Sequence, residues 1–516
     1  MGFQAVSVNY WAVMPILIVF GGALLGVLVE AFAARSVRHS IQLSISVVAL
    51  VAALVVLVMK SRHDQGTTLG GAVVIDGPAL FQMGSVLVLG LLSVMLMAEK
   101  FSSAGADAFT PMGAAVPGSD LERTATNAGW GTGEVFPLAL FSIAGMMIFP
   151  AANDLLTMFV ALEVVSLPLY ILTGLARRKR LLSQEAALKY FLLGSFSSAF
   201  FLFGSALIYG YAGSIHFGEV SQAISAGQTQ FDGLLLPGIV FVLVGLLFKV
   251  GAVPFHAWTP DVYQGAPSAV TGFMAACTKL AAFGAILRLV YVGIEANRLD
   301  WRLGVMAVAA LTMVVGSVLS VAQTDMKRLL AYSSIAHAGF ILTGVLAFDK
   351  AGVSGVMFYA LAYGLATIAA FGIIAMVRQA DDGAEATSVK QWDGLGKSHP
   401  VVAGIFALLL LTFAGIPLTS GFTAKFAAFA PAVATGGKGG VLLVVIGVLC
   451  SAITAYVYVK LIVRMYFEEG KGDVVAWTPS VVATIALAAA VIASIGLGVM
   501  PGPVLDLAGQ ASQFIR

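Results

Sequence analysis

Hydrophobic residues in this chain form long uninterrupted runs that are separated by short polar breaks. A membrane-spanning helix needs about 20 mainly apolar residues, which is the length of most of these runs. A membrane β-barrel would need alternating apolar and polar residues, and the runs do not alternate. The pattern predicts an all-α polytopic membrane protein with about 14 transmembrane helices. We place them at residues 10–33, 41–60, 78–98, 133–151, 153–175, 185–211, 234–258, 266–292, 301–323, 327–347, 351–378, 400–430, 440–466 and 478–500.

Composition agrees with a location in the lipid bilayer. Hydrophobic residues make up 59% of the 516 residues and charged residues only 10%, whereas soluble domains carry roughly 25% charged residues. The net charge of +2 is too small to indicate a nucleic-acid partner.

A polar insert rich in Gly, Ala, Ser and Asp interrupts the helical pattern and is expected to be a flexible loop. It separates three N-terminal helices from two sets of five helices, which a last helix and tail follow. The corresponding segments are 1–98 for the first three helices, 99–132 for the insert, 133–292 and 301–467 for the two five-helix repeats, and 478–516 for the C-terminal helix and tail.

Basic residues are distributed unequally between the loops on the two sides of the membrane. With 14 helices, loops after odd-numbered helices carry 15 Lys and Arg residues, and the other side carries 7. Cytoplasmic loops have an excess of Lys and Arg. The bias therefore predicts that both termini lie on the non-cytoplasmic side.

Four charged residues lie near the middle of predicted helices: Glu163, Lys249, Lys279 and Lys425. A charge at a helix centre costs roughly 2.5–3.5 kcal/mol on insertion scales, so such residues mark functional sites by default. Buried lysine and glutamate side chains can exchange protons, and a Glu beside a Lys forms a switchable pair. These residues indicate a proton relay; a fixed structural ion pair is the alternative.

Other polar residues within the helices have two interpretations each. Lys189, Arg288 and Lys460 lie nearer helix ends, where long side chains can reach the membrane interface. His337 follows Ser334 in a predicted helix. These hydroxyl and imidazole groups either extend a path for protons or hold helices together by hydrogen bonds.

Two predicted helices contain breaks, at Gly251–Pro254 in helix 7 and Gly415–Pro417 in helix 12. Proline removes a backbone donor, and freed carbonyls inside a membrane must face protein or water. Helices five apart run in opposite directions, as in an inverted repeat. We therefore expect two inverted five-helix repeats, helices 4–8 and 9–13, with broken helices 7 and 12; simple kinks are the alternative.

The residues give no indication of a cofactor bound by this chain. Cys277 and Cys450 have no neighbouring Cys or His ligands, and an iron–sulfur cluster needs about four ligands. The six histidines have no metal-ligand spacing, and no nucleotide-binding motif is present.

Four segments of the sequence resemble the antiporter-like membrane subunits of respiratory complex I, the proton-pumping NADH–quinone oxidoreductase. The resemblance is strongest to bacterial subunit N: subunit M usually has Glu where this chain has Lys425, and subunit L has a long C-terminal lateral helix. The four segments are 162–170 (LEVVSLPLY), 248–267 (FKVGAVPFHAWTPDVYQGAP), 327–340 (KRLLAYSSIAHAGF) and 415–426 (GIPLTSGFTAKF).

This resemblance implies roles for individual residues. Glu163 in helix 5 matches the glutamate that pairs with the helix 7 lysine, here Lys249. Lys279 matches the central lysine and Lys425 the terminal lysine of the same proton relay. Secondary positions of that axis are matched by Lys189 and His337.

The resemblance also implies partners and location. We expect a multi-pass protein of the bacterial plasma membrane that translocates protons beside a subunit M and small membrane subunits. It would be part of an enzyme without catalysing redox chemistry itself, with flavin, iron–sulfur clusters and quinone in partner subunits. Alternatives are a subunit of a multisubunit Na⁺(K⁺)/H⁺ antiporter, a structural scaffold, and a solute transporter.

Overall fold

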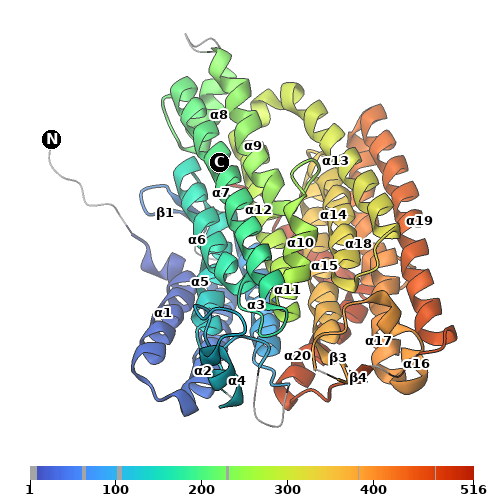
Figure 1. Cartoon of the computed structure of the whole chain (residues 1–516). Helices are drawn as coiled ribbons and strands as arrows, with labels where there is room; N and C mark the ends of the chain where they lie inside the picture. The colour runs from blue at the N-terminus through green and yellow to red at the C-terminus, as the bar shows by residue number, and fades with distance from the viewer. Residues whose placement is uncertain are drawn as a thin grey trace.

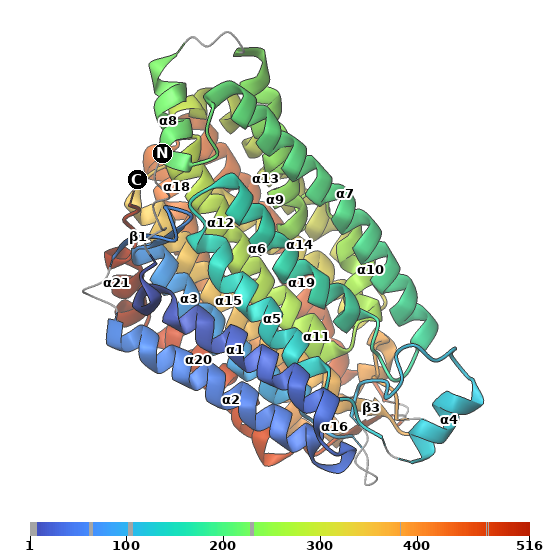
Figure 2. The same ribbon diagram turned by 90° about the vertical axis from the view of Figure 1, so that its left-hand side faces the viewer.

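The structure is a computed structural model, and it describes residues 8–60, 65–101, 107–128, 130–227, 232–381, 383–470, 472 and 474–515. Long helices run side by side through the molecule (Figures 1 and 2). Two short two-stranded antiparallel sheets, β1–β2 and β3–β4, lie in connections between helices. The predicted helical membrane class is confirmed: the described residues are mostly helical, with four short strands in connections.

The N-terminal part contains three long helices, one hairpin and one short helix. They are α1 (Tyr10–Phe32), α2 (Arg35–Lys60), β1 (Gly66–Thr68), β2 (Val73–Ile75), α3 (Gly77–Met97) and α4 (Asp120–Asn127).

The first set of helices after the insert includes a broken helix and two π-helical segments. Its elements are α5 (Val135–Ile148), η1 (Phe149–Ala151), α6 (Leu155–Thr173), α7 (Arg180–Ala212), α8 (Phe217–Ala226), η2 (Asp232–Leu234), α9 (Leu235–Val250), α10 (Trp258–Gly265), α11 (Ser268–Phe273), the π-segment η3 (Met274–Thr278), α12 (Lys279–Arg288) and the π-segment η4 (Leu289–Gly293).

The second set and the C-terminal helices follow. They are η5 (Glu295–Asn297), α13 (Arg298–Val321), α14 (Met326–Val345), α15 (Lys350–Met376), β3 (Val377–Gln379), η6 (Val389–Trp392), α16 (Leu395–Ser398), α17 (Pro400–Ala414), α18 (Ser420–Thr435), α19 (Gly437–Phe467), β4 (Val474–Ala476), α20 (Val481–Val499) and α21 (Gly502–Gln510).

Among the described residues, eleven helices are long and apolar enough to cross a membrane. The remaining predicted spans also coincide with helices: α5 with η1, α14, and the pair α17–α18. Because α5 and α17 are shorter than a full span, the count of 14 stays a prediction. The multi-pass membrane class does not depend on that count.

The centre of the bundle is formed by α15 and by the continuous helical stretch Ser268–Gly293. The whole apolar window of Ser268–Gly293 is buried, whereas fewer than half of the residues in the windows of α1, α2, α19 and α20 are buried. Exposed apolar side chains on these outer helices form a surface suited to lipid. The central helices therefore hold their charged residues away from lipid.

The described part of the 99–132 insert contains a short helix and a buried ion pair. Its helix α4 begins with Asp120 and Glu122, and acidic residues stabilise a helix N-terminus. Asp107 is buried, and its Oδ1 forms an ion pair with Arg177 Nη2 at 3.0 Å. The insert is thus anchored to the α6–α7 connection by a contact that composition could not show.

The two sets of helices share one backbone arrangement. Asp154 and Asp325 cap α6 and α14 with their side chains. Antiparallel bridges join Asp154 to His216, which follows α7, and Asp325 to Ser388, which follows α15. In each set, the aspartate that caps one long helix therefore pairs with a residue in the connection that follows the next long helix.

Arg288 is held in a buried ion pair rather than reaching a membrane interface. Its Nη2 lies 2.6 Å from Asp76 Oδ1, both side chains are 0% exposed, and Nε donates to Pro150 O at 2.7 Å. Asp76 also caps α3 and accepts a hydrogen bond from the Ile515 backbone at 3.1 Å. The alternative of a side chain extending to the interface is therefore wrong for Arg288.

Replacing Arg288 with Met is expected to lower the free energy of unfolding by about 3–5 kcal/mol, because it leaves the Asp76 carboxylate buried without a cation. The double variant Asp76→Asn/Arg288→Met should recover part of this loss. The measurement is the thermal unfolding midpoint of the purified membrane protein. If the loss of unfolding free energy in the double variant equalled the sum of the losses in the two single variants, the two residues would not act as a pair.

Candidate functional site

Lys249 lies at the C-terminal end of α9, just before a break in the helix. The Lys249 side chain is 4% exposed, and its Nζ donates to Ser166 Oγ on α6 at 2.6 Å. Nζ also lies 5.7 Å from the ring centroid of Tyr190 on α7. Three helices therefore surround the ammonium group with one hydroxyl and one aromatic face.

The break after Lys249 is formed by Gly251, whose φ of 75° is strained for other residues. Its amide donates to Phe248 O at 3.0 Å, and Trp258 Nε1 donates to the same oxygen at 3.0 Å. Backbone groups inside a membrane must find partners within the protein. Trp258 therefore stabilises the break beside Lys249.

Glu163 lies one helical turn before Ser166 on α6 and is partly buried. Its Oε1 is buried without a hydrogen-bond partner in the described structure. Within the described residues, no Glu163 oxygen lies within 4.0 Å of a cationic nitrogen. In this conformation Lys249 therefore bonds to Ser166, and the expected pairing of Lys249 with Glu163 is not a direct contact.

Lys279 connects the first set of helices to the second. It begins α12 directly after the π-segment η3, and its Nζ donates to both the hydroxyl and the carbonyl oxygen of Ser334 on α14 at 2.5 Å. Nζ lies 5.4 Å from the ring centroid of Tyr363 on α15. The ammonium group thus sits between three buried helices.

His337 lies one turn after Ser334 on α14. Its Nδ1 shares a hydrogen bond with Tyr359 Oη at 2.8 Å, and its ring lies 4.8 Å from the ring of Tyr363. The opposite nitrogen, Nε2, is buried and has no partner in the described structure. A histidine with one free nitrogen can either accept or donate a proton.

Lys425 lies in α18 beside the second break. Its Nζ donates to Phe413 O at 3.0 Å, Ala414 O at 2.8 Å and Ser451 Oγ at 2.6 Å. Those carbonyls end α17, where the helix dipole is negative and favours a cation. A cavity of about 470 Å³ adjoins Lys425, and apart from Lys425 and Ser451 its lining residues are apolar or glycine.

The contacts form a line across the bundle from Lys279 to Lys425. Tyr363 lies against both Lys279 and His337. His337 in turn packs on Phe413 at 5.8 Å, whose carbonyl binds Lys425. In Figure 1, α12 lies to the left of α14, α15 and α18.

Lys189 lies apart from this line in a partly exposed charged cluster. Its Nζ pairs with Asp261 and Glu185, each at 2.7 Å, and the Lys189 side chain is 42% exposed. Asp261 also binds Arg328 Nη1 at 2.6 Å. Sequence reasoning did not single out Asp261 or Arg328, although both lie in the quoted motifs and their opposite charges were visible there.

Comparison with known proteins identifies the family. A family model described as NADH:quinone oxidoreductase/Mrp antiporter, TM, matches residues 152–454. A Rhodococcus opacus protein named NADH-quinone oxidoreductase subunit N is 52% identical over 532 aligned positions, covering 99% of this chain and 97% of the relative. This chain belongs to the NADH-quinone oxidoreductase subunit N family.

Solved structures of this family and of a related one share the fold. A chain of respiratory complex I from Thermus thermophilus with bound aureothin is 31% identical, with a TM-score of 0.76, covering 96% of this chain and 100% of that chain. A chain of the Mrp complex from Dietzia has a TM-score of 0.79 at 21% identity, covering 98% of this chain and 97% of that chain. At that identity, the second match shows the fold alone.

Asp261→Asn is expected to lower the free energy of unfolding by about 1 kcal/mol, the upper range for partly exposed ion pairs, because two cations lose their shared carboxylate. Glu185→Gln removes another carboxylate from Lys189 and is the matched control, with a smaller effect expected. Thermal unfolding of both variants measures the difference. Equal effects would contradict the bridging role of Asp261.

Gly421→Ala is expected to destabilise the second break by about 1–3 kcal/mol through overpacking. A Cβ at Gly421 would lie 1.7 Å from Thr412 O, whereas a Cβ at Gly496 in α20 would meet nothing within 4 Å. Gly496→Ala is therefore the control. Assembly yield and unfolding temperature should fall for Gly421→Ala alone; unchanged values for both would contradict the close approach of α17 and α18.

Proposed function

We propose that this chain translocates protons across the bacterial plasma membrane as subunit N of NADH-quinone oxidoreductase. The observation that carries the proposal is a set of three buried lysines, each bonded to a serine hydroxyl inside the bundle: Lys249, Lys279 and Lys425. Structural lysines in a membrane core would be expected to pair with carboxylates. None of the three has such a partner within 4.0 Å among the described residues.

The arrangement suits transfer of charge from one site to the next. Each serine hydroxyl can accept from an ammonium group and donate onward. Because like charges repel strongly where the dielectric constant is low, protonation of one lysine favours release from its neighbour. Glu163, with an unbonded buried oxygen, would stabilise the charge on Lys249 when the two approach.

The secondary residues would serve the ends and the middle of this axis. His337 would connect Lys279 to Lys425, since its ring packs against residues that contact both. Lys189 would act at the surface of the first set of helices, where its pairing with Asp261 holds it.

Two inverted five-helix repeats, within a total of 14 spans, would place this axis at their centre. The shared bridges at Asp154 and Asp325 and the two helix-ending glycines, Gly251 and Gly415, support this organisation. Asn9 N donates to Thr68 Oγ1 at 2.9 Å, and Ile515 N donates to Asp76. The described chain ends therefore lie near the β1–β2 hairpin, which supports termini on one side of the membrane; the proposed side is the non-cytoplasmic one.

The driving reaction would occur in other subunits. Relatives of this chain are named for NADH–quinone oxidoreduction, so flavin, iron–sulfur clusters and quinone would be bound by partners, and a subunit M and small membrane subunits would be neighbours. This chain would take part in the enzyme without redox catalysis of its own. The described residues contain no group of three or more His, Cys, Asp or Glu that could hold a metal.

The antiporter alternative rests on a shared fold. The Mrp chain resembles this one at 21% identity, whereas the named subunit N relative is 52% identical over nearly the full length. Sequence identity therefore favours the oxidoreductase.

Lys249→Met is expected to reduce proton pumping and NADH–quinone turnover about tenfold or more in assembled complex, equivalent to ~1.4 kcal/mol on the activation barrier. Lys460→Met, which alters an exposed lysine of α19, should leave both rates unchanged. Pumping and turnover are measured in membrane vesicles after assembly is confirmed.

The remaining outcomes separate the alternatives. Wild-type rates in assembled Lys249→Met complex would remove the central residue of the proposed relay. Failed assembly, with normal activity in whatever complex forms, would favour a scaffold. A change in sodium or potassium tolerance without any NADH-driven activity would favour the antiporter.

A further inference from the structure

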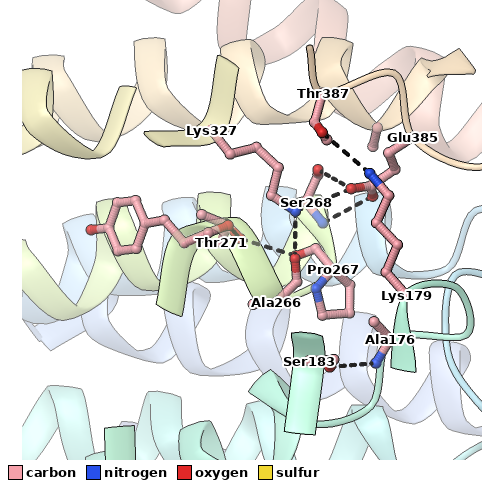
Figure 3. A network of polar contacts seen from close by, with 12 residues as sticks. Ala176, Lys179, Ser183, Ala266, Pro267, Ser268, Thr271, Lys327, Glu385 and Thr387 are labelled. Atoms are coloured by element: carbon pink, nitrogen blue, oxygen red, sulfur yellow. Dashed lines mark hydrogen bonds and ion pairs between the residues drawn. The ribbon is translucent and has the colours of Figure 1, made fainter. Parts of the chain in front are cut away.

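A second cavity lies away from the lysine axis, where segments from both sets of helices meet. Its volume is about 110 Å³. It is lined by the α6–α7 connection, the α10–α11 junction, the start of α14, residues 101 and 107–108, and residues 378, 383–385 and 387. Figure 3 shows Lys327 and Lys179 reaching across this region toward Glu385 and Thr387.

Positive charge dominates the cavity wall. Five cationic side chains line it against two carboxylates, an excess of three positive charges. The cations are Arg177, Arg178, Lys179, Lys327 and Arg378; the carboxylates are Asp107 and Glu385.

Both carboxylates are already engaged. Asp107 pairs with Arg177 at 3.0 Å. Glu385 pairs with Lys327 at 3.1 Å and accepts from Ser268 Oγ at 2.7 Å. Burial opposes ionisation of Glu385, but the nearby cations Lys327 and Arg378 outweigh it and lower its pKa to about 2. Neither carboxylate is therefore left to neutralise the other cations.

Two of the remaining cations face the cavity without an acidic partner. Arg178 and Lys179 form no ion pair within the part of the chain that the structure describes. Lys179 donates to a neutral group, Thr387 Oγ1, at 3.3 Å. Their charges are therefore available to a ligand.

Arg177 is fixed in the cavity wall by its own hydrogen bonds. The Arg177 side chain is 8% exposed, and its Nη2 and Nε donate to Asp107 and the Trp130 carbonyl. Arg177 therefore contributes positive charge to the wall, while the exposed Arg178 and Lys179 are the cations that a ligand can reach.

We propose that this cavity binds a phosphate-class oxyanion, either inorganic phosphate or the phosphate of an anionic phospholipid headgroup. A phosphate offers several acceptor oxygens and matches the fork of an arginine side chain. About 10–15 Å³ suffices for one water molecule, so the cavity has room for a tetrahedral anion. Basic pockets between helices at the cytoplasmic side bind phospholipid headgroups in other membrane proteins.

The bound anion would link the two sets of helices. Lys179 belongs to the α6–α7 connection and Lys327 begins α14, so a ligand between them joins the first set to the second. The site is separate from the lysine axis and does not depend on the proposed proton path.

Chemical footprinting of the assembled complex tests the site. Acylation of Lys179, which is exposed, is followed by peptide mass spectrometry in delipidated complex with inorganic phosphate or with cardiolipin. Chloride at equal ionic strength and phosphatidylcholine are the respective controls, because screening alone slows no single lysine selectively. We expect labelling of Lys179 to slow about tenfold at saturation while the exposed Lys397, outside the cavity, is unaffected.

A variant assigns the protection to the cavity. Arg178→Gln should weaken binding of the protecting ligand about tenfold, equivalent to ~1.4 kcal/mol, whereas Lys390→Gln, an exposed cation outside the cavity wall, should not. Protection by phosphate identifies the free anion, and protection by cardiolipin alone identifies the lipid headgroup. Absence of selective protection by both ligands, or equal weakening in the two variants, would overturn the proposal.

Discussion

The arrangement of this protein depends on how its buried ammonium groups are solvated. A cation taken from water into a low-dielectric interior is strongly disfavoured unless protein groups replace its hydration shell. The ammonium groups of Lys249, Lys279 and Lys425 each donate a hydrogen bond to a serine hydroxyl oxygen. Because oxygens that accept hydrogen bonds without a full opposite charge leave the cation only moderately stabilised, these lysines are suited to losing and regaining a proton.

The helix breaks follow from the same requirement. A continuous α-helix uses its carbonyl oxygens for internal hydrogen bonds, so a cation can only share such an oxygen, as Lys279 shares that of Ser334 in α14. The break at Gly415 frees the oxygens of Phe413 and Ala414, and Lys425 binds both. At the first break, Trp258 rather than Lys249 donates to the oxygen of Phe248, which also accepts from the Gly251 amide. The two breaks thus resemble each other in backbone geometry, but only the carbonyl oxygens at the second break bind a lysine.

Two ion pairs in the same bundle have the carboxylate partner that the three lysines of the proposed relay lack. Arg288 and Asp76 form a fully buried pair, and Lys327 and Glu385 form a second, less completely buried pair at the start of α14. In these pairs each charge is matched by an opposite charge, which favours a permanent contact. The lysines of the axis have hydroxyl and carbonyl partners instead, and aromatic rings such as Tyr363 separate one site from the next.

The sequence by itself determined the membrane class, the approximate helix positions, the two breaks and the charged residues within the helices. These features follow from local properties: apolar run length, proline and glycine, and the high cost of an intramembrane charge. The partners of those charges could not be read locally. That Lys249 bonds to Ser166 instead of Glu163, that Arg288 is buried against Asp76 and that Asp261 joins Lys189 to Arg328 were decided by tertiary packing, because residues 67 to 212 positions apart meet only when the helices associate.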